Sequence, residues 1–302
     1  MCHSREVNTT GKEFAFDVVV VGSANLDLVA TLDHLPKPGE TIVALGYAEH
    51  AGGKGVNQAV ACARMGARTA FVGCVGNDDA GIFLRGVLEN EGIDTTMLLV
   101  VDMPTGRAFI NVDSRGENAI VVVSGANTQV GVAQKPLVLP TSRVLLMQLE
   151  IPIETVAAAL IAARKNGSVT VLNPAPYKML SSEILSLVDV IVPNETESAA
   201  CGGTNVLLTA GVATVVTTLG EKGAVINTAT SETNIAPHKV VAIDTVGAGD
   251  AFIGALSAEL ARGATISDAA SVGAVAGALA TTVRGAVPSL PMRDVVRKAM
   301  GK

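Results

Sequence analysis

Short runs of β-branched and other apolar residues alternate along the chain with longer stretches of helical period. Buried strands are expected at 17–22, 69–73, 144–148, 169–172, 188–192, 213–219 and 223–226. Helices are expected from about 55 through 64, at 80–90, at 153–165 and over most of the chain from 248 onward. Strands that alternate with helices are typical of a parallel sheet covered on its faces. The pattern therefore predicts an α/β fold with a mostly parallel central sheet flanked by helices.

Two pairs of segments break the alternation and have the pattern of antiparallel hairpins, namely 28–31 with 41–47 and 107–112 with 119–123. Turn-forming residues at 113–117 join the second pair. We interpret these strands as a small β-sheet that projects from the domain as a lid, although an extension of the main sheet fits the pattern nearly as well. The expected division is a polar N-terminal tail at 1–16 and one α/β domain at 17–302, with lid strands from about 28–47 and 107–123.

The composition narrows the class of protein. Hydrophobic residues make up 49% of the 302 residues and charged residues 17%, which is too apolar for a disordered chain. Aromatic residues make up 3% and the net charge is −6, which argues against base stacking and against a surface that tracks nucleic-acid phosphates. Four cysteines without a C-x-x-C pair suit a reducing cytosol, and no apolar stretch reaches the length of a membrane span. We expect a cytoplasmic protein that binds neither nucleic acid nor membrane.

The sharpest motif is D-T-V-G-A-G-D-A-F at 244–252, where a helical pattern begins. Small residues at Gly247, Ala248 and Gly249 allow several backbone N–H groups to converge at the helix N-terminus, where the helix dipole also favours an anion. Taken alone, Asp250 would be interpreted as a partner of that dipole. Because it follows a loop of small residues, it could also be the base that accepts a hydroxyl proton in phosphoryl transfer.

A second glycine cluster is G-G-K-G-V-N at 52–57, in which Lys54 and Asn57 supply hydrogen-bond donors. It is not a Walker A loop, because Gly55 stands where that motif has Ser or Thr. No G-x-G-x-x-G follows the first strand either, which weakens a dinucleotide-binding interpretation. A tight strand-to-helix turn would account for the cluster without any ligand.

Polar residues follow several of the predicted strands, where ligands of open parallel sheets bind. Asn25 and Asp27 suit a polyhydroxylated ligand, although an Asx turn explains them about as well. Glu197 suits a hydrated Mg²⁺ ion or an ordinary acid at a helix N-terminus. The two-glycine turn at 218–223 is a weak candidate for a nucleotide contact. The histidines lack zinc-ligand spacing.

Together these motifs resemble the ribokinase family of carbohydrate kinases over nearly the whole chain, from about 17 to 289. A-G-G-K-G-V-N-Q-A-V-A-C-A-R-M-G-A at 51–67 is similar to the family's N-terminal signature, and D-T-V-G-A-G-D-A-F is a highly specific match to its C-terminal one. L-N-P-A-P at 172–176 and P-N-E-T-E at 193–197 also resemble the family. The resemblance implies a three-layer α/β sandwich with a β-sheet lid. It further implies ATP-dependent phosphorylation of D-ribose at its 5-hydroxyl, giving ribose 5-phosphate.

Roles for individual residues are also implied by the resemblance. Asp250 would be the catalytic base, with an anion hole formed by Gly247, Ala248 and Gly249. Sugar contacts are implied for Asn25, Asp27, Gly53, Lys54, Asn57, Glu150 and Asp250. Nucleotide contacts are implied for Asn194, Thr218, Gly220, Gly223 and Gly249. Glu197 would hold Mg²⁺ through water, and a monovalent cation (K⁺) is implied beside Asp244, Val246, Ala280, Gly285 and Ser289.

The resemblance also implies a homodimer that forms through the lid strands. One segment departs from the family's pattern, because the chain between Glu197 and Thr218 is short and G-G-T-N at 202–205 stands where the family usually has a helix. That departure lies on the nucleotide side of the implied site and does not touch the catalytic loop.

The sequence disfavours three alternatives to a ribose kinase. A family kinase for another sugar or a nucleoside is disfavoured by the few aromatic residues and by Asn25, Asp27 and Glu150, which suit a small free sugar. A non-catalytic sugar-binding sensor on the same fold would have no need of an anion hole followed by Asp250. A nicotinamide-dependent dehydrogenase lacks its glycine fingerprint.

Overall fold

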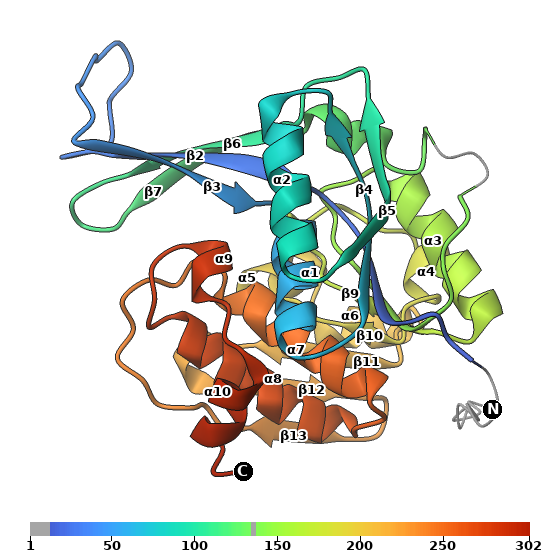
Figure 1. Cartoon of the computed structure of the whole chain (residues 1–302). Coiled ribbons are helices and arrows are strands. Elements are labelled where there is room, and N and C mark those ends of the chain that lie inside the picture. Colours follow the sequence, from blue (N-terminus) through green and yellow to red (C-terminus); the bar gives the residue numbers. More distant parts are fainter. Residues whose placement is uncertain (1–12, 134–136) are drawn as a thin grey trace.

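The computed structural model describes residues 13–133 and 137–302, so that most of the tail expected at 1–16 lies outside the described residues (Figure 1). Its strands are β1 Phe16–Val21, β2 Asn25–Thr31, β3 Gly46–Gly52, β4 Thr69–Gly76, β5 Asp94–Val101, β6 Gly106–Val112, β7 Asn118–Val123, β8 Ser142–Met147, β9 Val169–Leu172, β10 Val190–Ile191, β11 Thr214–Thr218, β12 Ala224–Asn227 and β13 Glu232–Ile235. Its α-helices are α1 Lys54–Arg64, α2 Asp79–Asn90, α3 Ile153–Asn166, α4 Ser182–Leu185, α5 Glu195–Ala200, α6 Thr204–Thr209, α7 Ala248–Ala261, α8 Ile266–Ala280, α9 Ala286–Ser289 and α10 Arg293–Ala299. Two 3-10 turns lie at Gly125–Gln129 and Gly220–Lys222.

The central sheet has nine strands within the described ranges, in the order β13-β12-β11-β10-β9-β8-β1-β4-β5. Every pair of neighbours from β11 to β5 is parallel, whereas β12 and β13 are antiparallel additions at one edge. The predicted mostly parallel sheet is confirmed. Because the parallel strands run the same way, their carboxyl ends meet at one edge of the sheet, and ligands of such sheets bind there.

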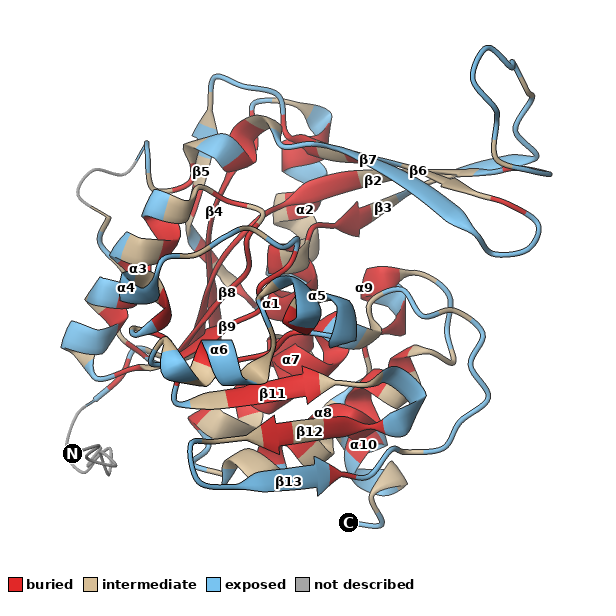
Figure 2. Ribbon diagram, turned by 180° about the vertical axis from the view of Figure 1, so that it is seen from behind, coloured by how far each residue is buried: buried red, intermediate tan, exposed pale blue. Residues whose placement is uncertain are grey.

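Alternating side chains of β1 show how the two faces of the sheet are covered. Val18 and Val20 belong to a core cluster shared with α1, α2, α7 and α8, whereas Val19 and Val21 belong to a second cluster shared with α3, α4 and α6. In Figure 2 the buried residues follow the inner strands and the helix faces that meet them, while β7 and most of β13 are exposed. The sheet is therefore the middle layer of three.

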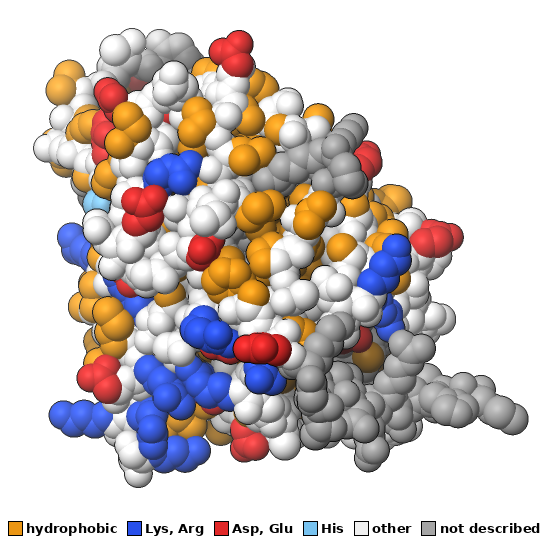
Figure 3. Space-filling view, turned by 45° about the vertical axis from the view of Figure 1, so that its right-hand side comes forward, with side chains coloured by type: hydrophobic (Ala, Val, Ile, Leu, Met, Phe, Trp, Pro, Cys, Tyr) orange, Lys and Arg blue, Asp and Glu red, His pale blue; other side chains and the backbone are white. Residues whose placement is uncertain are grey.

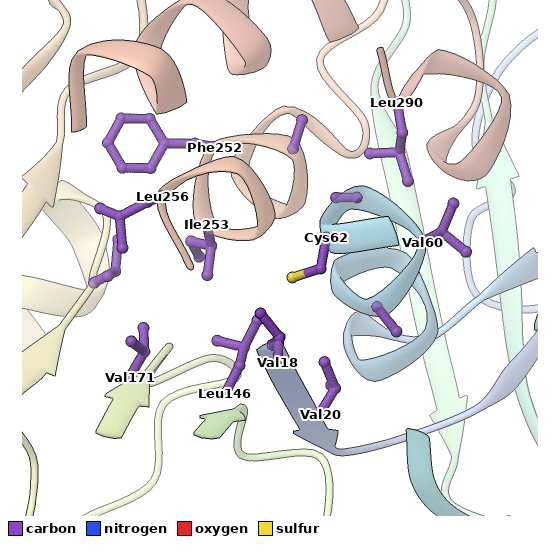
Figure 4. Packing of buried hydrophobic residues seen from close by; sticks show 14 of the residues in the cluster. Val18, Val20, Val60, Cys62, Leu146, Val171, Phe252, Ile253, Leu256 and Leu290 are labelled. Carbon is purple, nitrogen blue, oxygen red and sulfur yellow. The ribbon is translucent and has the colours of Figure 1, made fainter. Parts of the chain in front are cut away.

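Helices α1 and α7 pack directly against each other on one face of the sheet (Figure 4). A Cβ added to Gly254 of α7 would lie 2.3 Å from the Cβ of Ala61 in α1, so glycine is needed for this close approach. The thiol of Cys62 also donates to the carbonyl oxygen of Gly254 over 3.4 Å. This contact brings the first turns of the two helices together at the carboxyl edge of the sheet.

The second sheet has the order β3-β2-β6-β7 and extends from the body of the molecule (Figure 1). Strand β2 pairs parallel with β6, and the two outer strands are antiparallel to their neighbours. The hairpin expected at 107–112 and 119–123 is present as β6 and β7.

The strand expected at 41–47 is wrong in position, because β3 is Gly46–Gly52. Gly46 pairs with Thr31 at the end of β2, so the residues before Gly46 run past the end of β2. Val43 there is 89% exposed, because it has no strand to pack against. The apolar run at 42–45 therefore belongs to a loop.

The glycine pair expected to replace a helix separates two short helices instead. Gly202 and Gly203 have φ angles of 87° and 89°, which glycine adopts at little cost, and they end α5 and start α6. Thr204 and Asn205 are the first residues of α6, so only the two glycines of the segment 202–205 lie outside a helix.

The surface of the described part carries both charges and apolar side chains. On the face shown in Figure 3, Lys and Arg side chains gather at the lower left, and hydrophobic side chains are spread across the middle. Positive charge is therefore concentrated in one part of this face. None of the helices in the described ranges combines the length and apolar character that a membrane crossing needs.

Candidate active site

The loop before α7 has the geometry of an anion-binding helix N-terminus. Gly247 is the N-cap residue with φ 80°, and a Cβ there would lie 3.1 Å from Cα of Ala286. The first N–H groups of a helix have no acceptor inside it, so those at the start of α7 are available to a ligand. The N–H group of Ala248 is the least available to a ligand, because it already donates to the carbonyl oxygen of Thr245 over 3.3 Å. Gly249 has open space where a Cβ would stand.

Asp250 lies one residue further along α7 and is only 9% exposed. Its Oδ2 accepts a hydrogen bond from Asn57 Nδ2 over 2.9 Å, and its Oδ1 accepts one from Gln58 Nε2 over 2.8 Å. Both donors come from the first turns of α1, which the contact between α1 and α7 brings within reach. Each carboxylate oxygen keeps a lone pair for a further partner. Asp250 and Asn57 are among the site residues predicted from the sequence, whereas Gln58 is not, although it directly follows Asn57 in the chain.

The glycine cluster at 52–57 wraps closely around the turn that follows β1. A Cβ on Gly55 would lie 2.5 Å from both N and O of Ser23, and Gly53 has φ 85°. Glu150 holds this arrangement, since its Oε2 accepts from Ser23 Oγ over 2.5 Å and from the backbone N of Lys54 over 3.1 Å. Glu150 thus supports the Lys54 turn with one oxygen.

Asn25 is buried and its amide is fixed by Asn127, a residue that the sequence-based reasoning missed. Asn127 Nδ2 donates to Asn25 Oδ1 over 2.7 Å, and Asn127 Oδ1 accepts from the backbone N of Ala24 over 2.9 Å. Since its oxygen is used, Asn25 presents Nδ2 as its remaining group. A Cβ on Gly106 would lie 2.2 Å from Asn25 Oδ1, so that a glycine is needed where β6 passes this pair.

Asp27 lies on β2 against the backbone of Gly52 on β3, where a Cβ would approach its Oδ2 to 2.1 Å. Burial, and then the charges of Glu150 and Asp250, raise the pKa of Asp27 to about 7. Glu150 and Asp250 are thus close enough to act on Asp27 electrostatically. The carboxyl groups of Asp27, Glu150 and Asp250 are therefore coupled electrostatically.

Lys54 balances this acidic group. Burial lowers the pKa of Lys54, but the carboxylates of Asp250, Glu150 and Glu197 outweigh burial, and the pKa lies above the usual value. The ammonium group therefore stays charged at neutral pH.

A cavity of about 230 Å³ opens beside Asp250 and Lys54. Its other lining residues come from the carboxyl ends of β9, β10 and β11 and from the start of α7; they are Asn173, Val192, Asn194, Glu197, Thr218, Thr245, Gly247, Gly249 and Ile253. The structure therefore brings two residues of the predicted anion hole, Gly247 and Gly249, into one cavity with four other predicted site residues: Lys54, Asn194, Glu197 and Thr218. Ala248 does not line this cavity. Gly220 and Gly223 lie outside its lining, and a Cβ on Gly223 would meet the carbonyl oxygen of Ile235 at 2.1 Å, which gives that glycine a packing reason.

Asn194 and Glu197 form a capping box at the start of α5. Glu197 N donates to Asn194 Oδ1 over 2.8 Å, and Asn194 N donates to Glu197 Oε2 over 2.9 Å. Both interpretations of Glu197 are thus compatible, because one oxygen caps the helix while the side chain lines the cavity. No group of three or more His, Cys, Asp or Glu side chains that could hold a metal is found among the described residues.

The residues implied at a K⁺ site lie together at the back of the anion-binding loop. Asp244 Oδ1 accepts from Val246 N over 3.0 Å, and its Oδ2 accepts from Gly285 N over 2.9 Å. Backbone N of Asp244 donates to Thr281 O, next to Ala280, over 3.1 Å. A Cβ on Gly247 would lie 3.3 Å from Ser289 Oγ.

A buried carboxylate beside an anion-binding helix N-terminus, at the carboxyl edge of a parallel sheet, is an arrangement suited to phosphoryl transfer. The chain matches the model of the pfkB family of carbohydrate kinases over residues 15–293, and it belongs to that family. The resemblance read from the motifs is thereby confirmed.

Particular relatives narrow the comparison. The ribokinase of Haemophilus influenzae is 41% identical over 92% of this chain and 96% of its own length. Among solved structures, the ribokinase of Thermotoga maritima has a TM-score of 0.85 and 37% identity, covering 94% of this chain and 99% of its own. The ribokinase of Arabidopsis thaliana complexed with ribose and ATP also has a TM-score of 0.85, with 30% identity over 94% of this chain and 98% of its own.

Proposed function

We propose that this protein transfers the γ-phosphate of ATP to the 5-hydroxyl of D-ribose, giving ribose 5-phosphate and ADP. One observation carries the proposal: a carboxylate held by two side-chain amides lines the same cavity as the open backbone at Gly249. The full-length similarity to ribokinases supports ribose as the acceptor.

In the reaction that we propose, Asp250 accepts the proton of the 5-hydroxyl while that oxygen bonds to the γ-phosphorus. The bond from the γ-phosphorus to the β,γ-bridging oxygen breaks, and ADP leaves. Backbone N–H groups at Gly247, Ala248 and Gly249 stabilise the charge on the transferred group. Because Asp250 and the helix N-terminus are fixed before substrate binds, little reorganisation is needed at the moment of reaction.

The sugar is proposed to lie between Asp250 and the second sheet. Asn57 Oδ1 is buried without a hydrogen-bond partner among the described residues, so a sugar hydroxyl would satisfy it. Asn25 Nδ2 and the carboxyl group of Asp27 supply a donor and an acceptor beside it. Glu150, together with Gly53 and Lys54, completes the set of proposed sugar contacts.

The nucleotide is proposed to extend from the cavity along the ends of β10 and β11. Asn194 and Thr218 lie side by side there, in an isolated parallel bridge. Gly220, Gly223 and Gly249 are the other proposed nucleotide contacts. Lys54 is also suited to meet the phosphates, since its charge faces the same cavity.

The residues present fit both implied cations. Glu197 lines the cavity, and only one of its two carboxylate oxygens accepts the hydrogen bond of the helix cap. This single carboxylate fits Mg²⁺, because Mg²⁺ commonly binds one or two carboxylates and keeps several waters. When bound, Mg²⁺ would neutralise phosphate charge. The proposed K⁺ site, behind the anion hole, consists of the oxygen atoms of Asp244, Val246, Ala280, Gly285 and Ser289, which suit a hard cation.

The four-stranded sheet is proposed to act as a lid and as the contact of a homodimer. All of β7 is exposed, and Ile120, Val121 and Val123 are each at least half exposed, at 53%, 64% and 50%. An exposed apolar edge strand of this kind calls for a covering partner. Light scattering on the purified protein would measure the mass of the particle in solution; a monomer over the working concentration range would reject the dimer.

The test of the function is a substrate panel with coupled detection of ADP and ³¹P NMR of the product. Ribose, 2-deoxyribose, fructose and adenosine are compared with and without K⁺. We expect the highest kcat/KM for ribose and a phosphomonoester at its 5-position. A higher kcat/KM for fructose or adenosine would assign another substrate, and ribose binding without ADP formation would indicate a sensor.

A further inference from the structure

A row of buried amide side chains lies directly behind Asp250. Gln148 follows β8, Asn173 follows β9, and Gln58 lies between them in the first turns of α1. Gln58 and Gln148 are fully buried and Asn173 is 5% exposed. Buried amides are costly unless they are paired, so a row of three needs a reason beyond packing, for which apolar side chains would serve.

The hydrogen bonds of this row all point the same way. Gln148 Nε2 donates to Gln58 Oε1 over 2.6 Å. Gln58 Nε2 donates both to Asn173 Oδ1 over 3.1 Å and to Asp250 Oδ1 over 2.8 Å. Asn173 Nδ2 donates to the backbone carbonyl oxygen of Val192 over 3.0 Å.

The carbonyl at the end of the row fixes this direction. A backbone carbonyl can only accept, so Asn173 must turn Nδ2 toward Val192 and Oδ1 toward Gln58. Gln58 must then turn Nε2 toward Asn173, which leaves Oε1 to accept from Gln148. A reversed Gln58 would set oxygen against oxygen at both Asn173 and Asp250. The row therefore holds an N–H donor toward Asp250 whether or not Asp250 carries a charge.

We propose that Gln58 is a positioning residue for Asp250 in phosphoryl transfer, and that Gln148 and Asn173 act through it by fixing the orientation of its amide. The proposal rests on the proposed role of Asp250 as the base. Asn57 holds Oδ2 of the same carboxylate but is also placed toward the sugar. Gln58 makes contact with the base from behind, so its loss should act on the chemical step more than on sugar binding.

The first set of variants removes or reverses the donor. Gln58→Met keeps the size of the side chain but gives Asp250 Oδ1 no donor, and we expect kcat to fall about 10–100-fold with KM for ribose within about twofold, the scale of a misplaced catalytic group. Gln148→Glu cannot donate to Gln58, so it favours the reversed amide although it does not touch Asp250. We expect it to lower kcat about tenfold or more, and the double variant to be no worse than Gln58→Met, because coupled residues are not additive.

The second set separates positioning from packing. Gln58→Glu sets a carboxylate beside Asp250, and we expect the acid limb of the pH profile of kcat/KM to move up by about one pH unit through like-charge repulsion. A residue that only fills space would not move that limb. Gln148→Met removes the donor without adding charge and should lower kcat by less than Gln148→Glu.

The matched control is Ser257→Ala, because Ser257 is fully buried on the same helix as Asp250 and its hydroxyl has no partner among the described residues. It should leave kcat, KM and the pH profile unchanged. Thermal unfolding of each variant shows whether it is folded, and if Gln148→Glu does not fold, Gln148→Met and Gln58→Glu decide.

All variants are assayed with the acceptor that the wild-type protein phosphorylates best, so that a wrong substrate does not affect the outcome. A wild-type kcat in Gln58→Met, or an unmoved acid limb in Gln58→Glu, would overturn the positioning role while leaving the proposed function intact. Absence of turnover in the wild-type protein with every acceptor would instead reject the proposed function itself.

Discussion

Replacing Gly249 with alanine should make the protein more stable and far less active. Gly249 is the second residue of α7, no Cβ contact lies within 4 Å of it, and it lines the cavity beside Asp250. Alanine is favoured over glycine in helices by roughly 0.5–1 kcal/mol, which at this chain length corresponds to a rise in Tm of about 1–3 °C. The added methyl group would stand where the phosphoryl oxygens must approach the N–H groups. Loss of one such donor lowers kcat by about 10²–10³-fold.

The assay pairs thermal unfolding, followed by circular dichroism, with coupled detection of ADP. Gly86→Ala is the matched control, because Gly86 lies inside α2 with equally open space around it; it should raise Tm similarly and leave kcat unchanged. Gly247→Ala should lower Tm, since Gly247 has φ 80° and sits against Ala286. A Gly249→Ala protein with raised Tm and normal kcat would refute the placement of the phosphoryl group beside Gly249.

Three further predictions follow from the geometry of the site. The pKa of Asp27 is raised from an ordinary 3.8 to about 7, so the folded state loses stability as the pH rises through that interval. Asp27→Asn should therefore raise Tm relative to wild type at pH 8 but hardly at pH 4, and it should weaken ribose binding. An equal Tm difference at both pH values would contradict the raised pKa. Asn127→Leu removes the hydrogen bond that fixes the amide of Asn25. Initial-rate kinetics should then show a KM for ribose that is about tenfold higher, with kcat nearly constant. An unchanged KM would remove Asn25 from the sugar contacts. Chelation of divalent cations should stop turnover. Glu197→Gln should raise the Mg²⁺ concentration that restores turnover. An unchanged Mg²⁺ requirement would contradict the role of Glu197 as a Mg²⁺ ligand.

The sequence predicts those parts of the fold in which the pattern of apolar residues follows directly from burial. Strand β1 contains the apolar run Val18–Val21 because it is covered on both faces, and its position agrees with the prediction to within one residue. The first three residues of β13 are exposed and polar, so this strand lacks a pattern that would distinguish it from a loop. The apolar run around Val43 has the composition of a strand, but the strand with which it would pair, β2, ends at Thr31.

The candidate site also contains residues that the sequence predicts and residues that only the structure shows. Gly247 and Gly53 are visible in the sequence because a backbone with positive φ demands glycine and sets a recognisable string. Gln58 and Asn127 are not visible as supports, because their partners lie 192 and 102 residues away in the chain. A glutamine inside a helical pattern is ordinary, and only the three-dimensional contact of α1 with α7 shows which carboxylate it meets.

The most direct test of the account is the turnover of the Asp250→Asn variant with ribose and ATP. The variant keeps the shape of the side chain but cannot accept the hydroxyl proton. The account predicts that kcat falls by at least about 10²–10⁴-fold, while calorimetry still detects binding of ribose and of ATP. A kcat near the wild-type value would contradict Asp250 as the base, and with it the proposed mechanism.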